Sequence, residues 1–240
     1  MEISIETTVE KIFPAYIMHQ HWDMPDSFND SLFEIASEDA RKNKLKAADD
    51  AKNIGDLSNH IGHLRHNFLM DYREHSCVKT LTQMADRAIR EYLMINYKYD
   101  HKGDIRMMSD TFWQRGSEHN EDTGVITHTH IKSDFVVTYY PRIRLSEDCP
   151  DTSLHRGQVR FYDPSGLGKR LWPCNQSEEY IGGWYSLEPK EGSLVVFEGF
   201  VPHDSSQFVG GDRMCIPIMC DLDLPNQHCK SSVLEILGEK

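Results

Sequence analysis

Apolar residues in the first hundred positions recur every three or four residues in two stretches, as on one face of an amphipathic helix. In residues 26–44 this face holds Phe28, Leu32, Ile35 and Ala36, after Asp, Ser and Asn residues of the kind that cap helices. In residues 76–95 it holds Val78, Leu81, Ala85, Ala88 and Tyr92. The pattern predicts packed helices in a helical N-terminal part over about residues 1–104.

The pattern changes near residue 105. Short runs rich in Val, Ile, Phe and Tyr follow at residues 133–140, 157–164, 182–189, 193–200 and 213–222, separated by Gly, Pro and Asp. Such runs are typical of strands and turns, and several in succession indicate a sandwich or barrel. Pro217 interrupts the last run, so we expect an edge position or a bulge there. The prediction is a mainly β fold with α-helices, in which the N-terminal helices support a β-core over about residues 105–224.

Length and charge narrow the function classes. The chain has 240 residues, which suits one domain over residues 1–240 with a substantial core. Its 26 basic and 38 acidic residues give a formal net charge of −12, which repels phosphate backbones and anionic lipid heads. The N-terminus lacks the plan of a signal peptide, and the 6 cysteines include no CxxC pair. We therefore expect a cytoplasmic protein with reduced thiols that binds neither nucleic acid nor membrane.

Candidate chemistry begins with two histidines one residue apart, His128 and His130, directly before the apolar run at residues 133–140. On a strand, such positions point to the same side. The chain has 13 histidines, so a close pair by chance is one interpretation of this stretch. The other is a metal site, which needs further ligands from elsewhere in the chain.

His203 follows the apolar run 195–197, and Arg213 begins another run after a Gly-Gly turn signal. A strand that leaves through His203 and returns through Arg213 would bring these side chains together, with the His128 strand alongside. Neutral imidazole suits Fe(II), Zn(II) and other first-row metals, and Arg matches a carboxylate through two parallel hydrogen bonds. The residues thus predict a metal with three histidine ligands, open positions for a chelating co-substrate and O2, and an Arg for an acid. The alternative is an ordinary loop histidine and a structural ion pair.

At these residues the chain resembles the Fe(II)/2-oxoglutarate-dependent oxygenases, most of all a subfamily with an HxH pattern. The resemblance covers roughly residues 105–222 and lies in "HTHIKSDFVVTYY", "GQVRFYDP", "EPKEGSLVVFEGFVPH" and "DRMCIPI". It implies a double-stranded β-helix (jelly roll) with His128, His130 and His203 on Fe(II). It also implies that Arg213 holds the distal carboxylate of 2-oxoglutarate.

The chain departs from the family pattern at two positions. His130 stands where the commoner motif has Asp or Glu; it either ligates the metal or leaves that place to Asp134 or water. A side chain of its size disfavours halogenation, for which relatives keep a small residue there. Cys215 replaces the Ser that accompanies the Arg in many relatives, and Cys is a weak donor. A tyrosine hydroxyl, from Tyr139 or its neighbour Tyr140, is therefore expected to help bind 2-oxoglutarate, with core packing as the alternative.

The resemblance implies hydroxylation with decarboxylation of 2-oxoglutarate to succinate. Because the acidic surface argues against nucleic acid and the chain shows no hydrophobic anchor for a membrane, we expect the substrate to be a small metabolite, such as an amino acid or a derivative. Arg160 and Trp184 are candidate substrate contacts, and segments 114–126 and 165–186 are candidate entrance loops. Three other functions remain open: a peptidyl hydroxylase, a three-His cupin-type metalloenzyme without 2-oxoglutarate, and a non-catalytic jelly-roll binding module. A homodimer is left open as well.

Overall fold

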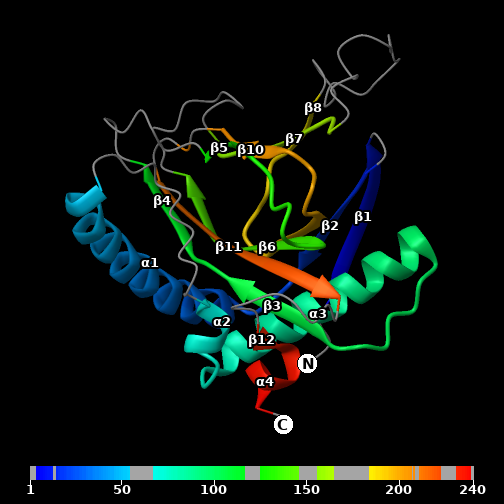
Figure 1. Ribbon diagram of the computed structural model, residues 1–240, viewed down its shortest axis with the longest axis horizontal. Coiled ribbons are helices and arrows are strands. Elements are labelled where there is room, and N and C mark those ends of the chain that lie inside the picture. The colour runs from blue at the N-terminus through cyan, green and yellow to red at the C-terminus, as the bar shows by residue number, and fades with distance from the viewer. Residues whose placement is uncertain are drawn as a thin grey trace.

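The computed structural model describes residues 4–12, 15–54, 67–116, 125–145, 156–164, 184–206, 208, 211–222 and 231–238. Within these residues the chain forms two antiparallel β-sheets and a set of helices (Figure 1). The helices lie along one side of the larger sheet, and the smaller sheet lies at its other side (Figure 1). The protein is therefore mainly β with helices, as the sequence predicts.

The larger sheet has eight strands within the described part of the chain. Its order is β1 (Ile5–Ile12), β2 (Ala15–Trp22), β9 (Ser193–Glu198), β6 (Phe135–Leu145), β11 (Gly211–Leu222), β3 (Ile105–Ser109) and β12 (Ser231–Ser232), and β4 (Phe112–Gly116) also pairs with β11. In the middle strands, side chains alternate between the helix side and the inner side, because successive residues of a strand point to opposite faces. Both faces of this sheet are therefore covered.

The first two strands correct the expectation of a helical part over residues 1–104. Residues 5–12 and 15–22 form an antiparallel hairpin, and β2 pairs with β9 along the edge of the sheet. The alternation in β2 is regular, with Ala15 and Ile17 buried on one face and Met18 and Trp22 on the other. The β-core thus begins a hundred residues earlier than predicted.

The smaller sheet consists, among the described residues, of β5 (Val125–His128), β10 (His203–Ser205), β7 (Val159–Tyr162) and β8 (Trp184–Leu187), in that order. Its inner face packs on the larger sheet through one apolar core. Phe161 of β7, Phe197 of β9 and Tyr140 of β6 belong to this core, which lies between the two sheets.

The predicted helices at residues 26–44 and 76–95 are confirmed by α1 (Asp26–Ile54) and α3 (Ser76–Tyr97). The short helices α2 (Phe68–Asp71) and α4 (Val233–Leu237) lie beside them. A second core joins the helices to the outer face of the larger sheet and includes Leu32, Leu81 and Tyr92. Among the described helices, none has the length and apolar composition needed to cross a membrane.

Pro217 does not lie on an edge strand. It sits inside β11, which pairs with β6 on one side and with β4 and then β3 on the other. The β4 pairing ends at Cys215 and the β3 pairing begins at Ile218, so Pro217 falls where one partner strand replaces the other. A shift of register in the β6 pairing lies between Met214 and Ile216. The extra residue of that shift belongs to β6, between Tyr139 and Arg142, and Pro217 pairs in regular register with Thr138, so neither the expected edge position nor a bulge is found at Pro217.

Candidate metal centre

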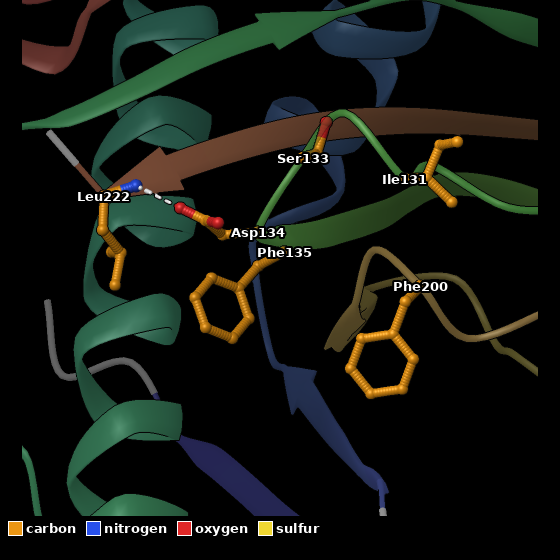
Figure 2. A pocket seen from close by; sticks show the side chains of 6 residues that line it. All are labelled: Ile131, Ser133, Asp134, Phe135, Phe200 and Leu222. Carbon is orange, nitrogen blue, oxygen red and sulfur yellow. Dashed lines mark hydrogen bonds between the residues drawn. The ribbon is translucent and has the colours of Figure 1, made fainter. Parts of the chain in front are cut away.

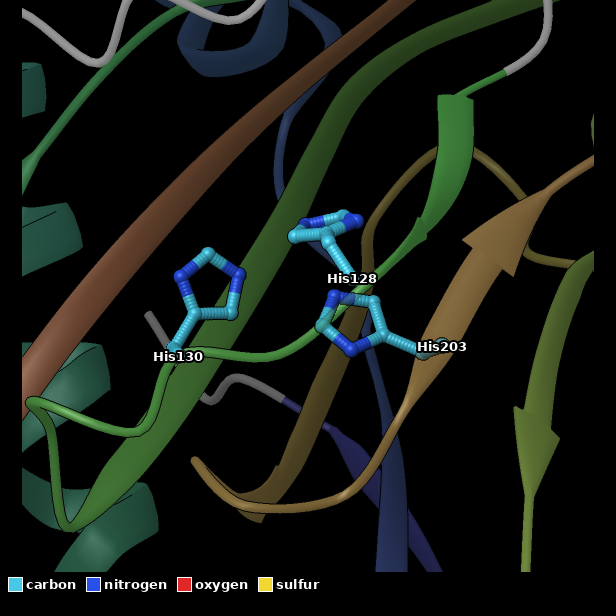
Figure 3. A group of neighbouring side chains, drawn as sticks. All are labelled: His128, His130 and His203. Carbon is cyan, nitrogen blue, oxygen red and sulfur yellow. The ribbon is translucent and has the colours of Figure 1, made fainter.

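Three histidines converge at one point between the sheets. His128, His130 and His203 each offer a ring nitrogen, and these nitrogens all lie within 4.8 Å of one another. The ring centres are 4.3 Å apart for His128 and His203, 4.9 Å for His128 and His130, and 5.2 Å for His130 and His203. His128 and His130 come from one continuous segment at the end of β5, and His203 comes from β10, so that the three rings lie close together (Figure 3). The predicted convergence of the three imidazoles is thereby confirmed.

Strand pairing brings two of them together. His203 begins β10 and pairs directly with His128, the last residue of β5. The register then shifts before Ser205, so β5 carries a bulge beside the pair. Bulges occur next to functional sites, where they re-aim a side chain.

His130 lies beyond the end of β5, in contrast to the predicted single strand. Its backbone N–H donates to the carbonyl oxygen of Gly199, with an N–O distance of 2.7 Å. A side chain on Gly199 would place a Cβ 2.6 Å from the His130 carbonyl oxygen and 2.1 Å from that of Ser133. The loop that presents His130 therefore packs on a position that only glycine fits.

The environment of His203 keeps its imidazole neutral. The ring packs on Phe197 and Phe161, with centre distances of 4.6 and 6.1 Å. Burial and the neighbouring His128 lower the pKa of His203 to about 3. Nδ1 lies 3.0 Å from the Val201 carbonyl oxygen, which can only accept, so Nδ1 carries the proton. Nε2 thus keeps its lone pair, as a metal ligand must.

Among the residues that the structure describes, Arg213 is the largest fully buried side chain, with 1% exposure. It begins the apolar part of β11 on the inner face, where its guanidinium carbon lies 5.1 Å from the centre of the Tyr140 ring and Nη1 lies 3.8 Å from Cys215 Sγ. Gly157 leaves the space for it, because a Cβ there would come 2.7 Å from Arg213 Cδ. Tyr140 and Cys215 belong to the same core as Phe197, on which His203 packs. A buried cation and three imidazoles therefore share the space between the sheets.

Tyr139 faces the other way. Its ring lies in the core on the helix side, and its hydroxyl donates to Asn29 Oδ1 of α1 over 2.6 Å. Because neighbouring residues of a strand point to opposite faces, Tyr140 is the one beside Arg213. The expected contact of Tyr139 with a co-substrate is therefore wrong, and the alternation along β6 could have selected Tyr140.

Two expected substrate contacts also point away from the histidines. Arg160 Nε donates to Asp204 Oδ1 over 2.7 Å on the outer face of the smaller sheet. Trp184 packs on Tyr162 on that same face, with ring centres 6.1 Å apart. Tyr185 is the inward neighbour of Trp184 and stacks on Phe161. The roles expected for Arg160 and Trp184 are therefore not supported by their positions.

Asp134, the alternative third ligand, is also placed elsewhere. Its Oδ2 accepts a hydrogen bond from the Leu222 backbone N–H over 2.9 Å. It lines a depression of about 520 Å³ beside α3, together with Ile131, Ser133, Phe135, Phe200 and Leu222 (Figure 2). None of the three histidines lines this depression. Residues 117–124 and 165–183, which make up most of the expected entrance loops, lie outside the described part of the chain.

Comparisons with known proteins give structural neighbours of low sequence identity. No family model matches the sequence, and no curated protein matches it. A Pseudomonas putida prolyl-4-hydroxylase is similar with a TM-score of 0.47 and 13% identity over 88% of each chain. The non-haem α-ketoglutarate-dependent carbocyclase SnoK from nogalamycin biosynthesis has a TM-score of 0.49 and 11% identity, over 85% of this chain and 78% of its own. Because these TM-scores lie below 0.5, the function of this chain is inferred from its own side chains.

Proposed function

We propose that the protein is a non-haem Fe(II)- and 2-oxoglutarate-dependent oxygenase. The observation that supports this most is the meeting of three imidazoles within 4.8 Å, in the same inter-sheet space as the buried Arg213. In this proposal the two sheets are the two halves of a double-stranded β-helix. The sequence resemblance described above and the layout of the site point to the same class of enzyme.

The donor set fits the metal. Three neutral imidazoles suit a first-row divalent ion, and three protein ligands leave positions open for a co-substrate and O2. His128, His130 and His203 would hold the ion. The bound dianion of 2-oxoglutarate would supply the negative charge that a carboxylate ligand provides in the commoner motif, and so balance the charge of Fe(II). When bound, iron and 2-oxoglutarate supply the oxidation of a C–H bond, with release of succinate and CO2.

The residues around Arg213 fit a carboxylate. A buried guanidinium offers a planar set of donors that matches a carboxylate through two hydrogen bonds. Burial raises the pKa of Tyr140, so its hydroxyl stays protonated beside the guanidinium and can donate as well. Arg213 and Tyr140 would thus orient the acid, while Phe161 and Phe197 exclude water around the histidines.

The proposed reaction is hydroxylation of a small metabolite, such as an amino acid or a derivative. The test is succinate production from 2-oxoglutarate with Fe(II) and air, first without and then with candidate substrates. Mass spectrometry should find a gain of one oxygen in a small molecule. A gain confined to peptides would make the protein a peptidyl hydroxylase. Tight metal binding without succinate would favour a cupin-type enzyme that does not use 2-oxoglutarate, and no metal binding at all would leave a binding module.

A further inference from the structure

One buried carboxylate links three strands of the smaller sheet behind the histidines. Asp204 follows His203 on β10, points to the opposite face and is 5% exposed. Its Oδ2 accepts from Thr127 Oγ1 of β5 over 2.9 Å and from the Tyr162 hydroxyl of β7 over 2.6 Å. Its Oδ1 accepts from Arg160 Nε of β7 over 2.7 Å. This single side chain therefore ties β5, β10 and β7 together.

The contact with Thr127 lies at the bulge in β5. The register shifts between His203 and Ser205, so β5 has one residue more than β10 in this stretch. Thr127, which bonds Asp204, lies within the shift, and His128 comes next. A slip of one residue would turn His128 to the other face of the strand, away from His203. The backbone pairing alone does not prevent this, because β10 is only 3 residues long.

The three side chains that donate to Asp204 suit a buried carboxylate. Burial and the carboxylate of Asp204 raise the pKa of Tyr162, so its hydroxyl remains a donor. Arg160 supplies the countercharge that a buried carboxylate needs. Every one of these donors comes from a strand that neighbours β10. The carboxylate is thus held from both sides of its own strand.

We propose that Asp204 is a positioning residue, which fixes the bulge through Thr127 and so keeps the His128 imidazole opposite that of His203. The inference rests on the proposed function, because it concerns the use of these histidines as ligands. It also assigns Arg160 and Tyr162 to the support of the metal centre and not to contact with substrate.

The test measures Co(II) affinity, the visible spectrum of bound Co(II) and thermal stability. Asp204→Asn keeps an acceptor oxygen but removes the charge, and Thr127→Val removes one hydroxyl at nearly constant volume. We expect each variant to lower Co(II) affinity about tenfold or more and to change the spectrum. The double variant should lose little more than Asp204→Asn alone, because both substitutions release the same bulge.

A matched control lies elsewhere in the chain. Asp39 of α1 is 2% exposed and accepts from Thr111 Oγ1 over 2.6 Å, so Asp39→Asn removes a similar buried charge away from the histidines. Asp39→Asn should lower the melting temperature but leave Co(II) affinity and spectrum unchanged. If it weakens Co(II) binding as much as Asp204→Asn, the effect is one of general stability and the inference fails.

Two further outcomes are also decisive. A wild-type spectrum and affinity in Thr127→Val overturn the inference, even if Asp204→Asn does not fold. Wild-type protein that binds no Co(II) or Fe(II) overturns the proposed function itself, which separates the two failures.

Discussion

The guanidinium carbon of Arg213 lies 5.1 Å from the centre of the Tyr140 ring, and both side chains are almost fully buried. If this arginine holds the distal carboxylate of 2-oxoglutarate, its planar fork matters and not only its charge. Arg213→Lys should therefore raise the dissociation constant for 2-oxoglutarate by about tenfold or more, at unchanged Fe(II) affinity. Titration with 2-oxoglutarate under anaerobic conditions measures this.

The control for that experiment is Arg142→Lys. Arg142 is a buried arginine of the neighbouring β6 that pairs with Asp30 of α1. Its replacement should cost stability without changing the 2-oxoglutarate requirement. An unchanged requirement in Arg213→Lys would remove Arg213 from the co-substrate site.

A substitution at Cys215 is expected to strengthen the binding of 2-oxoglutarate. The Cys215 thiol lies 3.8 Å from Arg213 Nη1, and burial raises the pKa of the thiol, so it stays protonated. A thiol donates only weakly, whereas a hydroxyl donates well. Cys215→Ser should therefore lower the dissociation constant for 2-oxoglutarate severalfold, by about 1 kcal/mol of binding free energy. Equal or weaker binding, measured by the same anaerobic titration, would mean that position 215 does not touch the acid.

The proposed metal ligands can be tested one at a time. His203→Ala removes a buried imidazole of the proposed site and should abolish stoichiometric Fe(II) binding, whereas His101→Ala, at another buried histidine, should not. His130→Asp should keep iron, because it restores the commoner set of two histidines and one carboxylate. Metal analysis after anaerobic loading measures both. Stoichiometric iron and full activity in His203→Ala would show that the site is wrongly assigned.

Gly199 supports His130 through its carbonyl oxygen and through the absence of a side chain. In Gly199→Ala the new Cβ would lie 2.1 Å from the Ser133 carbonyl oxygen, so the loop that carries His130 must move. We expect a loss of metal affinity together with a loss of about 2 kcal/mol or more in stability. Gly238→Ala is the control: its Cβ meets no atom within 4 Å, and only its φ of +74° costs energy. Metal affinity should fall in the first variant alone.

The low pKa of His203 predicts a pH dependence of the metal-free protein. The unfolded chain takes up a proton on this imidazole below its ordinary pKa of 6.5, whereas the folded protein does so only near its pKa of about 3. Between these values the unfolded state binds more protons, so the free energy of unfolding decreases as the pH is lowered, by up to about 1.4 kcal/mol per pH unit. Above the ordinary pKa this contribution is constant. Urea denaturation of wild type and His203→Gln at about pH 7 and pH 5 should show a smaller loss in the variant. Equal losses would contradict the neutral, buried state of His203.

Sequence periodicity predicts the long, regular parts of this fold. The apolar faces of residues 26–44 and 76–95 return as buried faces of α1 and α3, and the Val- and Phe-rich runs return as strands. The hairpin of β1 and β2 is not predicted, because its outer strand, IETTVEKI, consists mostly of Glu, Thr and Lys and shows no regular alternation of apolar and polar residues. The strand β10 is not predicted either, because a strand of 3 residues is too short to show an alternation of apolar and polar positions.

The site is predictable in its residue types but not in its register. His128, His130 and His203 can be named from their order and spacing, yet no local pattern shows that His203 pairs with His128 or that β5 is bulged there. A shift of one residue along a strand decides which side chain points into the space between the sheets. Tyr140 and not Tyr139 lies beside Arg213, and Tyr185 and not Trp184 points inward. Such choices depend on long-range strand pairing, which a single sequence does not display.

The hairpin of β1 and β2 covers an edge of β9 that could otherwise pair with a strand of another chain. β9 carries the apolar run that packs on His203, and β2 occupies its otherwise open side. Without residues 5–22, β9 would present unpaired N–H and C=O groups beside Val195 and Phe197, which invites another chain to add a strand. β1, the strand that takes the outer place, bears Glu6, Thr7, Thr8 and Glu10, whose polar side chains discourage such pairing. A fragment cut to the region that looks like an oxygenase by sequence should therefore aggregate, and expression trials should keep these first strands.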